Sequence, residues 1–182
     1  MENIKSQLEI STGHKKWIIE EQNKILIKLN RNFMTIVDLL FEFPDYGESN
    51  SLHLLENYFS NIRDKLSVKN LDLAHVVLFI ENEKLIENIK TYYETLEQIS
   101  KKKKEALNKL RSATEETQNI SAETEKELSE DDLRPIDLLI QPETYRNIKK
   151  EYMDYCFNNA TGQAWENYIS SVREFLKSTD RQ

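Results

Sequence analysis

The fold is decided by residues 71–120, LDLAHVVLFIENEKLIENIKTYYETLEQISKKKKEALNKLRSATEETQNI. One series of residues recurs there every seven positions and a second follows it by four, a spacing that places both on one seam of an α-helix. The first series consists of Leu71, Leu78, Leu85, Tyr92, Ile99, Ala106, Ala113 and Ile120. No Pro or Gly interrupts the stretch. It therefore predicts a single unbroken helix that begins after Asn70.

Glycine and proline are scarce, and their positions mark the ends of the predicted helices. Of 182 residues, 3 are Gly and 3 are Pro. They are Gly13, Pro44, Gly47, Pro135, Pro142 and Gly162. Each lies where the apolar periodicity also breaks, so two independent signals agree. They predict an all-α fold: an elongated helical bundle with a long coiled-coil-like helix and a C-terminal helical hairpin.

Two further helices are expected before the long one. The first would run from Thr12, a residue type that caps helices, to Phe43, where the turn sequence PDYG at 44–47 ends it. The second would start near Asn50 or Ser51, either of which can cap it, and end at a corner formed by residues 67–70.

These boundaries divide the chain into three consecutive parts. Residues 1–120 would form a helical bundle that includes the heptad-bearing helix. Residues 121–141 combine an acidic linker with a short apolar plug. Residues 142–182 would form the C-terminal hairpin, with Pro142 at the first position of one helix and Thr161 as the cap of the other.

The two halves of the long helix differ in apolar content. Phe79, Ile86 and Tyr93 lie beside the seam in the first half, as in a helix packed within a bundle. The second half has a weaker seam, which would face the C-terminal helices, a second copy or another protein. For the aromatic residues of the last helices, core is the favoured interpretation and a docking surface the alternative. The candidate partner-binding residues are Leu96, Ile99, Ala106, Leu110, Ala113, Trp165 and Tyr168.

Two polar residues interrupt the seam. For Asn82 the favoured interpretation is a buried amide that sets the register of helix pairing, as a polar residue does in a coiled coil. The alternative is that the seam is exposed there. For Lys103 exposure to solvent is the favoured interpretation, because the seam on either side of it is weak, and a buried polar residue is the alternative.

Charge bears on the kind of partner. The formal net charge of −7 disfavours a protein that wraps nucleic acid through basic residues. Lys101–Lys104 is a basic run, but four consecutive residues point around the whole circumference of a helix, so we expect solvated charge. Contact with the acidic segment 121–132 is a further use. A nucleic-acid-associated accessory protein that uses Lys101–Lys104, Lys109 and Arg111 is the alternative function.

No motif names a reaction. The chain contains no Gly-rich phosphate loop, no HExxH and no CxxC. His53 and Glu56 have the i,i+3 spacing found in helical metal sites, as do Asp72 and His75, but both pairs lie near helix starts, where an acidic residue complements the helix dipole. We expect no metal, no cofactor and no enzymatic activity, and a metal-dependent helical enzyme is a third option. The single cysteine, Cys156, is expected to be buried and unreactive.

The function predicted from these features is a non-catalytic helical subunit or adaptor of a larger assembly, which docks through its coiled-coil seam. Its partner would be another protein or a second copy in a homo-oligomer. No signal sequence is recognisable at the N-terminus, and no apolar stretch approaches the roughly 20 residues needed to cross a bilayer. We therefore expect a cytoplasmic protein without a membrane span.

Overall fold

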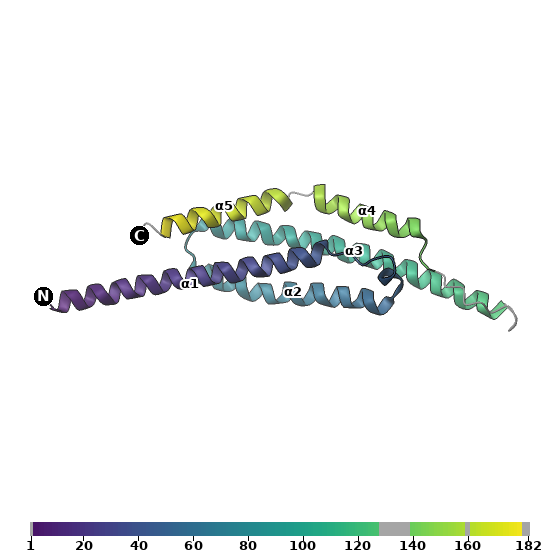
Figure 1. Cartoon of the computed structure of the whole chain (residues 1–182), viewed down its shortest axis with the longest axis horizontal. Helices are drawn as coiled ribbons and strands as arrows, with labels where there is room; N and C mark the ends of the chain where they lie inside the picture. Colours follow the sequence, from purple (N-terminus) through teal and green to yellow (C-terminus); the bar gives the residue numbers. More distant parts are fainter. Residues whose placement is uncertain (1, 128–138, 159–160, 180–182) are drawn as a thin grey trace. The chain divides into compact units, whose positions relative to one another are not determined.

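The computed structural model describes residues 2–127, 139–158 and 161–179; for 2–11, 66–72, 75 and 121–127 it describes the path of the helix alone. Within this part of the chain the regular structure is helical and no strand occurs, which confirms the all-α class (Figure 1). The elements are α1 (Glu2–Phe41), η1 (Glu48–Asn50), α2 (Leu52–Phe79), α3 (Glu83–Glu127), α4 (Pro142–Asn158) and α5 (Thr161–Thr179).

The helices build two compact units, each assembled from separate stretches of the chain. Unit 1 draws on Met1–Val37, Lys65–Leu96 and Ala160–Gln182. Unit 2 draws on Asp38–Asp64 and Glu97–Asn159. Helices α1, α2 and α3 contribute to both units, whereas α4 belongs to unit 2 and α5 to unit 1. The units therefore divide the chain differently from the three consecutive parts expected from the sequence, because long helices run from one unit into the other.

The prediction of one unbroken helix from Leu71 to Ile120 is wrong in its first part. Residues 67–70, the expected corner, continue α2, and the chain leaves the helix only after Phe79. Leu78 and Leu85 hold the same heptad position, yet Leu78 is 75% exposed and Leu85 is fully buried. The seven-residue spacing therefore continues in the sequence, but the helix does not, because the break between α2 and α3 separates the two leucines. The long helix is present, and it begins at Glu83.

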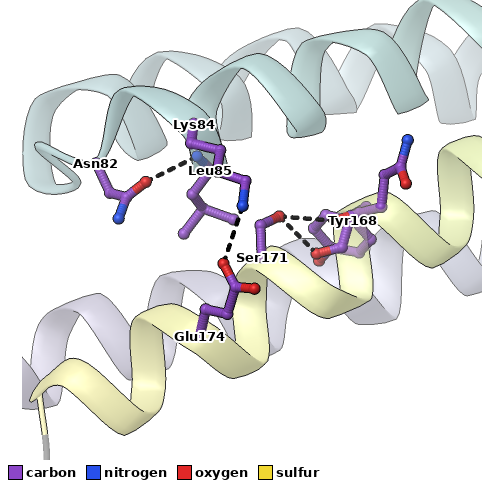
Figure 2. Close-up of polar contacts among 7 residues, drawn as sticks. Asn82, Lys84, Leu85, Tyr168, Ser171 and Glu174 are labelled. Carbon is purple, nitrogen blue, oxygen red and sulfur yellow. Dashed lines mark hydrogen bonds and ion pairs between the residues drawn. The ribbon is translucent and has the colours of Figure 1, made fainter.

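Asn82 explains why the chain restarts as a helix at that point. The backbone N–H of Leu85 donates to Asn82 Oδ1 at 2.9 Å (Figure 2), and the backbone N–H of Ile86 donates to the Asn82 carbonyl at 3.0 Å. A side-chain oxygen in this position satisfies a backbone N–H that has no partner within the helix. Asn82 is exposed, whereas Ile80 is buried and anchors the turn in the core. The prediction that Asn82 is a buried register residue is therefore wrong.

Several predicted boundaries are confirmed. Helix α1 ends at Phe41, just before the turn that contains Pro44, and α2 begins directly after Ser51. Pro142 is the first residue of α4, and α5 begins at Thr161. The Thr161 hydroxyl makes no capping hydrogen bond among the described residues.

Two other predictions, for the start of the first helix and for residues 121–141, are not confirmed by the structure. The first helix begins at Glu2 rather than after Thr12, so the predicted cap lies within α1. Of the predicted acidic linker and apolar plug, residues 121–127 continue α3 and residues 128–138 lie outside the described residues. Ile140, at the end of this stretch, is buried.

The core of unit 1 is aromatic at its centre. The ring of Phe33 lies edge-on to those of Tyr92 and Tyr168, with centroids 4.9 and 5.3 Å away. Tyr92 and Tyr168 stack on each other with centroids 5.6 Å apart. All three side chains are at most 2% exposed. Aromatic pairs at such distances add to the free energy gained from buried area, so these rings hold α1, α3 and α5 together.

On the surface of unit 1, α3 and α5 are also joined by an ion pair. Lys84 Nζ lies 3.1 Å from Glu174 Oε2 (Figure 2). On α5, the Ser171 hydroxyl lies 2.9 Å from the Tyr168 carbonyl, so this buried polar group is satisfied within its own helix. Ser171 can therefore lie beside the aromatic contacts of α5 without leaving its hydroxyl group unpaired.

Candidate functional site

Five of the predicted partner-binding residues are buried by the chain itself. Their exposed fractions are 0% for Leu96, 0% for Ile99, 5% for Ala106, 0% for Leu110 and 1% for Tyr168. Ala113 and Trp165 are half-buried. This burial arises within the described part of the chain, without a second copy or another protein. These five side chains do not form an accessible surface.

Lys103 is the clearest departure from expectation, because it is fully buried rather than exposed. Its ammonium group donates hydrogen bonds to the carbonyls of Leu39 and Glu42. It also lies over the ring of Tyr58, with Nζ 5.3 Å from the ring centroid. The last carbonyls of a helix have no partner within the helix and carry partial negative charge, so a cation is favourable there. Lys103 closes the C-terminal end of α1.

The environment of Lys103 changes its acidity. Burial lowers the pKa of Lys103 to about 8, while the nearby Glu42 carboxylate acts in the opposite direction. Lysines with a lowered pKa serve as nucleophiles or bases in some enzymes. Here the side chain has no exposed surface at which a substrate could meet the amine. The arrangement is therefore a structural contact within unit 2.

Cys156 lies in the same unit and behaves as the sequence predicts. The thiol is free and buried. Burial raises the pKa of Cys156, which keeps it in the less reactive thiol form.

The remaining cations of the basic region are engaged in ion pairs or point in different directions. Lys102 Nζ lies 2.6 Å from Glu105 Oε2, and Arg111 Nε lies 2.9 Å from Glu115 Oε1. Across the interhelical surface, Lys109 pairs with a carboxylate of α4 at 2.6 Å. With Lys103 buried and Lys101 exposed, the four-lysine run does not form one basic face, as expected. The side chains of residues 121–132, the proposed acidic contact, lie outside the described part.

The described part of the chain also bears on metal binding and membrane crossing. Among the side chains that the structure describes, no group of three or more His, Cys, Asp and Glu residues is placed to hold a metal ion. His53 and Glu56 are both exposed, and the side chains of Asp72 and His75 lie outside the description. Within the described ranges, no helix combines the length and the apolar character that a membrane crossing requires.

An accessible apolar surface of unit 1 is formed by residues of α1 and α2. Trp17 and Leu78, which we name the Trp17 surface, are 49% and 75% exposed. The Trp17 ring contacts Phe79 edge-on at 6.5 Å and stacks with His14 at 5.8 Å on α1. A cavity of about 550 Å³, lined by residues that include Trp17, Leu78 and Phe79, opens beside this surface.

Sequence reasoning missed this surface, although a signal was present. Residues 76–80, VVLFI, form five consecutive apolar positions. One face of a helix cannot bury all of them, so at least one side chain must point away from the core. Val76 and Ile80 are buried, and Val77 and Leu78 are the ones left exposed.

The Trp17 surface and the Lys103 contact differ in their accessibility to a partner. The Trp17 surface is accessible and apolar, whereas the Lys103 contact is enclosed. Only the first can take part in binding without a rearrangement of the helices. Comparisons with models of known protein families, with curated proteins and with solved structures find no match to this chain.

Proposed function

We propose that this chain is a non-catalytic helical subunit or adaptor of a cytosolic assembly, and that it binds another protein through the Trp17 surface. The observation that carries the proposal is the exposure of Trp17 and Leu78 beside one cavity of unit 1. Single exposed apolar residues are ordinary, but a cluster that includes a tryptophan is typical of interaction sites.

The physical reason is burial. Covering a leucine or valine side chain completely contributes about 1.5–3 kcal/mol relative to leaving it in water. The cavity beside Trp17 offers a place for an apolar side chain of the partner, which would then contact the Trp17 and Phe79 rings. The partner expected here is therefore a protein that presents an exposed apolar residue of its own.

The seam residues and the basic run, which the sequence analysis offered as binding sites, support a partner less well than the Trp17 surface does. The seam residues from Leu96 to Leu110 are covered by the chain's own helices. The alternative of a nucleic-acid-associated protein is weaker, because Lys103 is buried and Lys102 is paired with Glu105.

The test is co-purification from the native host. A tagged chain carrying Leu78→Glu is compared with the unaltered chain and with Phe157→Glu, a matched control on unit 2 whose side chain is 74% exposed. Both substitutions replace an exposed apolar residue with the same carboxylate, so circular dichroism should show the same helix content.

The expected result is a different protein that co-purifies in fixed ratio with the unaltered chain and with Phe157→Glu, and that is lost with Leu78→Glu. If every co-purifying protein is retained by Leu78→Glu, the Trp17 surface is not the docking site. If the unaltered chain retains no protein after cross-linking in the host, the role as an adaptor is wrong.

A further inference from the structure

A groove lies between α1 and α5 of unit 1 and encloses a cavity of about 620 Å³. Apolar side chains of both helices form much of its lining, among them Ile27 of α1 and Val172 and Leu176 of α5. Ile27 is 55% exposed, and the two side chains of α5 are half-buried. The described helices of the chain therefore leave an apolar surface partly uncovered here.

The charged side chains that line this groove are both cations. They are Arg31 of α1 and Arg173 of α5, and no Asp or Glu lines the cavity. Both arginines are exposed, and neither guanidinium pairs with a carboxylate among the described residues. The formal net charge of the chain is −7, so a groove lined by cations alone departs from the charge balance of the molecule. Acidic groups of an occupant would complement it.

The basic character extends along α1. Residues 22–37 contain three cations and no acidic residue. Lys24, Lys28 and Arg31 have the spacing i, i+4 and i+7, so they share one face of the helix, and all three are exposed. A second copy of α1 would bring these cations to a groove that already holds two arginines. The charges therefore favour an acidic partner over a second copy of this chain.

The form of the groove indicates a helical occupant. Two helices packed side by side leave a groove that a third helix can fill, and the described part of the chain has no strand whose edge could pair with an extended peptide. On α1 the lining extends from Asn23 to Arg31, about 12 Å or two helical turns. A helix with apolar residues at i, i+3 or i+4, and i+7 covers that length. The sugar-phosphate backbone of a nucleic acid has no comparable apolar face.

Two amide oxygens of the groove lack partners. The Oδ1 atoms of Asn23 and Asn30 are shielded from solvent and accept no hydrogen bond among the described residues, although both side chains line the cavity. Buried polar atoms in folded proteins are nearly always hydrogen-bonded. Rotation about χ2 exchanges the oxygen of each amide with its nitrogen, so these side chains can present acceptors to a bound helix. The occupant is therefore expected to carry an amide or hydroxyl donor on its contact face as well.

We propose that the groove between α1 and α5 binds a helical segment of another protein in which Asp and Glu flank an apolar face. The apolar face covers Ile27 and Val172, and the carboxylates pair with Arg31 and Arg173. The proposal goes beyond the function proposed above, because it gives the chain a second docking surface and specifies the chemistry of its occupant. An adaptor with two separate docking surfaces can hold two proteins together.

The test uses the full chain and a displayed library of helical peptides of about 14 residues, or four turns, with their surface positions randomised. The peptide that binds most tightly is synthesised together with a counterpart in which every Asp and Glu is replaced by Lys. Fluorescence anisotropy then gives the dissociation constant of each peptide for the unaltered chain and its variants.

The variants are Arg31→Glu, Arg173→Glu, the double variant with both exchanges, and Ile27→Glu. Lys90→Glu is the matched control, since Lys90 is an exposed cation of α3 outside the groove. All the altered residues are exposed, and circular dichroism verifies that each variant is folded.

The selected peptides are expected to be acidic, to have apolar residues at helical spacing, and to bind Lys90→Glu as tightly as the unaltered chain. Each arginine exchange should raise the dissociation constant at least about tenfold, because an attraction becomes a repulsion where the peptide covers the charge. Ile27→Glu should also weaken binding. The Lys-substituted counterpart should bind the double variant more tightly than it binds the unaltered chain.

A selection that yields only basic peptides, or only peptides indifferent to Arg31 and Arg173, would overturn the proposal, as would a selection that yields none. Vesicles of anionic phospholipid and duplex DNA are measured in parallel. If either binds through the two arginines while no acidic peptide does, the groove recognises phosphate groups and the proposed occupant is wrong.

The two proposals fail separately. Leu78 lies outside the groove, so Leu78→Glu should leave peptide binding unchanged. If Leu78→Glu loses the co-purifying protein but no peptide depends on the two arginines, the groove proposal alone is refuted. If peptides depend on the arginines but Leu78→Glu retains every co-purifying protein, the Trp17 surface alone is refuted.

Discussion

Unit 1 and unit 2 are closed by different kinds of contact. At the centre of unit 1, the rings of Phe33, Tyr92 and Tyr168 pack directly against one another. In unit 2, buried polar side chains reach main-chain carbonyls. Tyr145 donates its hydroxyl to the Pro44 carbonyl at 2.9 Å. Unit 2 also contains ring contacts, so the difference lies in the hydrogen bonds that its side chains add to main-chain carbonyls.

The polar contacts of unit 2 concentrate on the end of α1 and on the segment that connects α1 to α2. Thr114 donates to the Ser49 carbonyl at 2.9 Å, and Tyr152 donates to the carbonyl of Leu40. Together with Lys103, these side chains come from α3 and α4. The segment needs them because the carbonyls at and beyond a helix end lack intrahelical partners, and buried carbonyls without a hydrogen bond are costly.

Around its three central rings unit 1 contains regular helices, whose backbone groups pair within each helix. At the break after α2 a side chain from another helix joins in, where Gln22 donates to the Phe79 carbonyl at 2.8 Å. The centre of unit 1 can be filled with side chains chosen for shape and area alone. We therefore expect the stability of unit 1 to follow buried apolar area, and that of unit 2 to depend in addition on hydrogen bonds and on the protonation of Lys103.

The largest effect is expected for Phe33→Ala. Phe33 is fully buried between two tyrosines, and removal of a phenyl ring from a core costs about 3–5 kcal/mol. Urea denaturation measures the loss, and hydrogen exchange resolved along the chain should show protection falling first in unit 1. Phe157→Ala is the control, because that side chain is 74% exposed and should change stability by less than about 0.5 kcal/mol. Equal loss of protection in both units would mean that they unfold as one.

A smaller effect is expected for Lys103→Met. Methionine fills a similar volume but leaves the carbonyls of Leu39 and Glu42 without their donor, a cost of about 1–3 kcal/mol. Hydrogen exchange should increase around the end of α1 and η1 more than in unit 1. A variant as stable as the unaltered chain would show that the desolvation of the charge offsets the hydrogen bonds.

The pH dependence of that difference follows from the lowered pKa of Lys103. Its folded-state pKa is about 8, against an ordinary value of 10.5, so between these values the unfolded chain binds more protons than the folded one. The free energy of unfolding of the unaltered chain should therefore rise, relative to Lys103→Met, as the pH increases from about 8 to 10.5, and the difference should be constant below that window. Urea titrations of both proteins across this range measure it. An advantage that falls with rising pH would contradict a lowered pKa.

The smallest effects are expected for the exposed ion pairs, one in each unit. Lys84–Glu174 joins α3 to α5 and Lys109–Glu151 joins α3 to α4, at 3.1 and 2.6 Å. Exposed pairs contribute about 0–1 kcal/mol and are screened by salt. A double-mutant cycle on each pair, at low and high salt, should give similar small coupling energies in the two units. A large coupling in only one of them would show that surface charge also distinguishes the units.

Much of the helical pattern could be predicted because its causes are local. Pro44 and Pro142 restrict the backbone wherever they occur, and α1 and α4 end and begin close to them. The apolar spacing likewise predicted that Leu96, Ile99 and Leu110 share one seam, and all three are buried.

The break between α2 and α3 could not be located in the same way. Asn70 and Asn82 are both residues that cap helices, and the heptad spacing runs past both without a change of phase. What separates them is that Ile80 finds a place in the core of unit 1 while Leu78 does not. Because the break was misplaced, the sequence did not predict the Trp17 surface, which lies next to it.

By itself, the sequence determined that this protein is all-α, where α1 ends, where α2, α4 and α5 begin, and which seam of the long helix is apolar. These properties depend on neighbours within a few turns. Only the tertiary structure decided what covers that seam, and that Lys103 is buried. Its partners, Leu39 and Glu42, lie more than sixty residues away in sequence. A polar residue in a weak seam can be buried only if the end of another helix places carbonyl groups within hydrogen-bonding distance of it. The local sequence pattern does not contain that information.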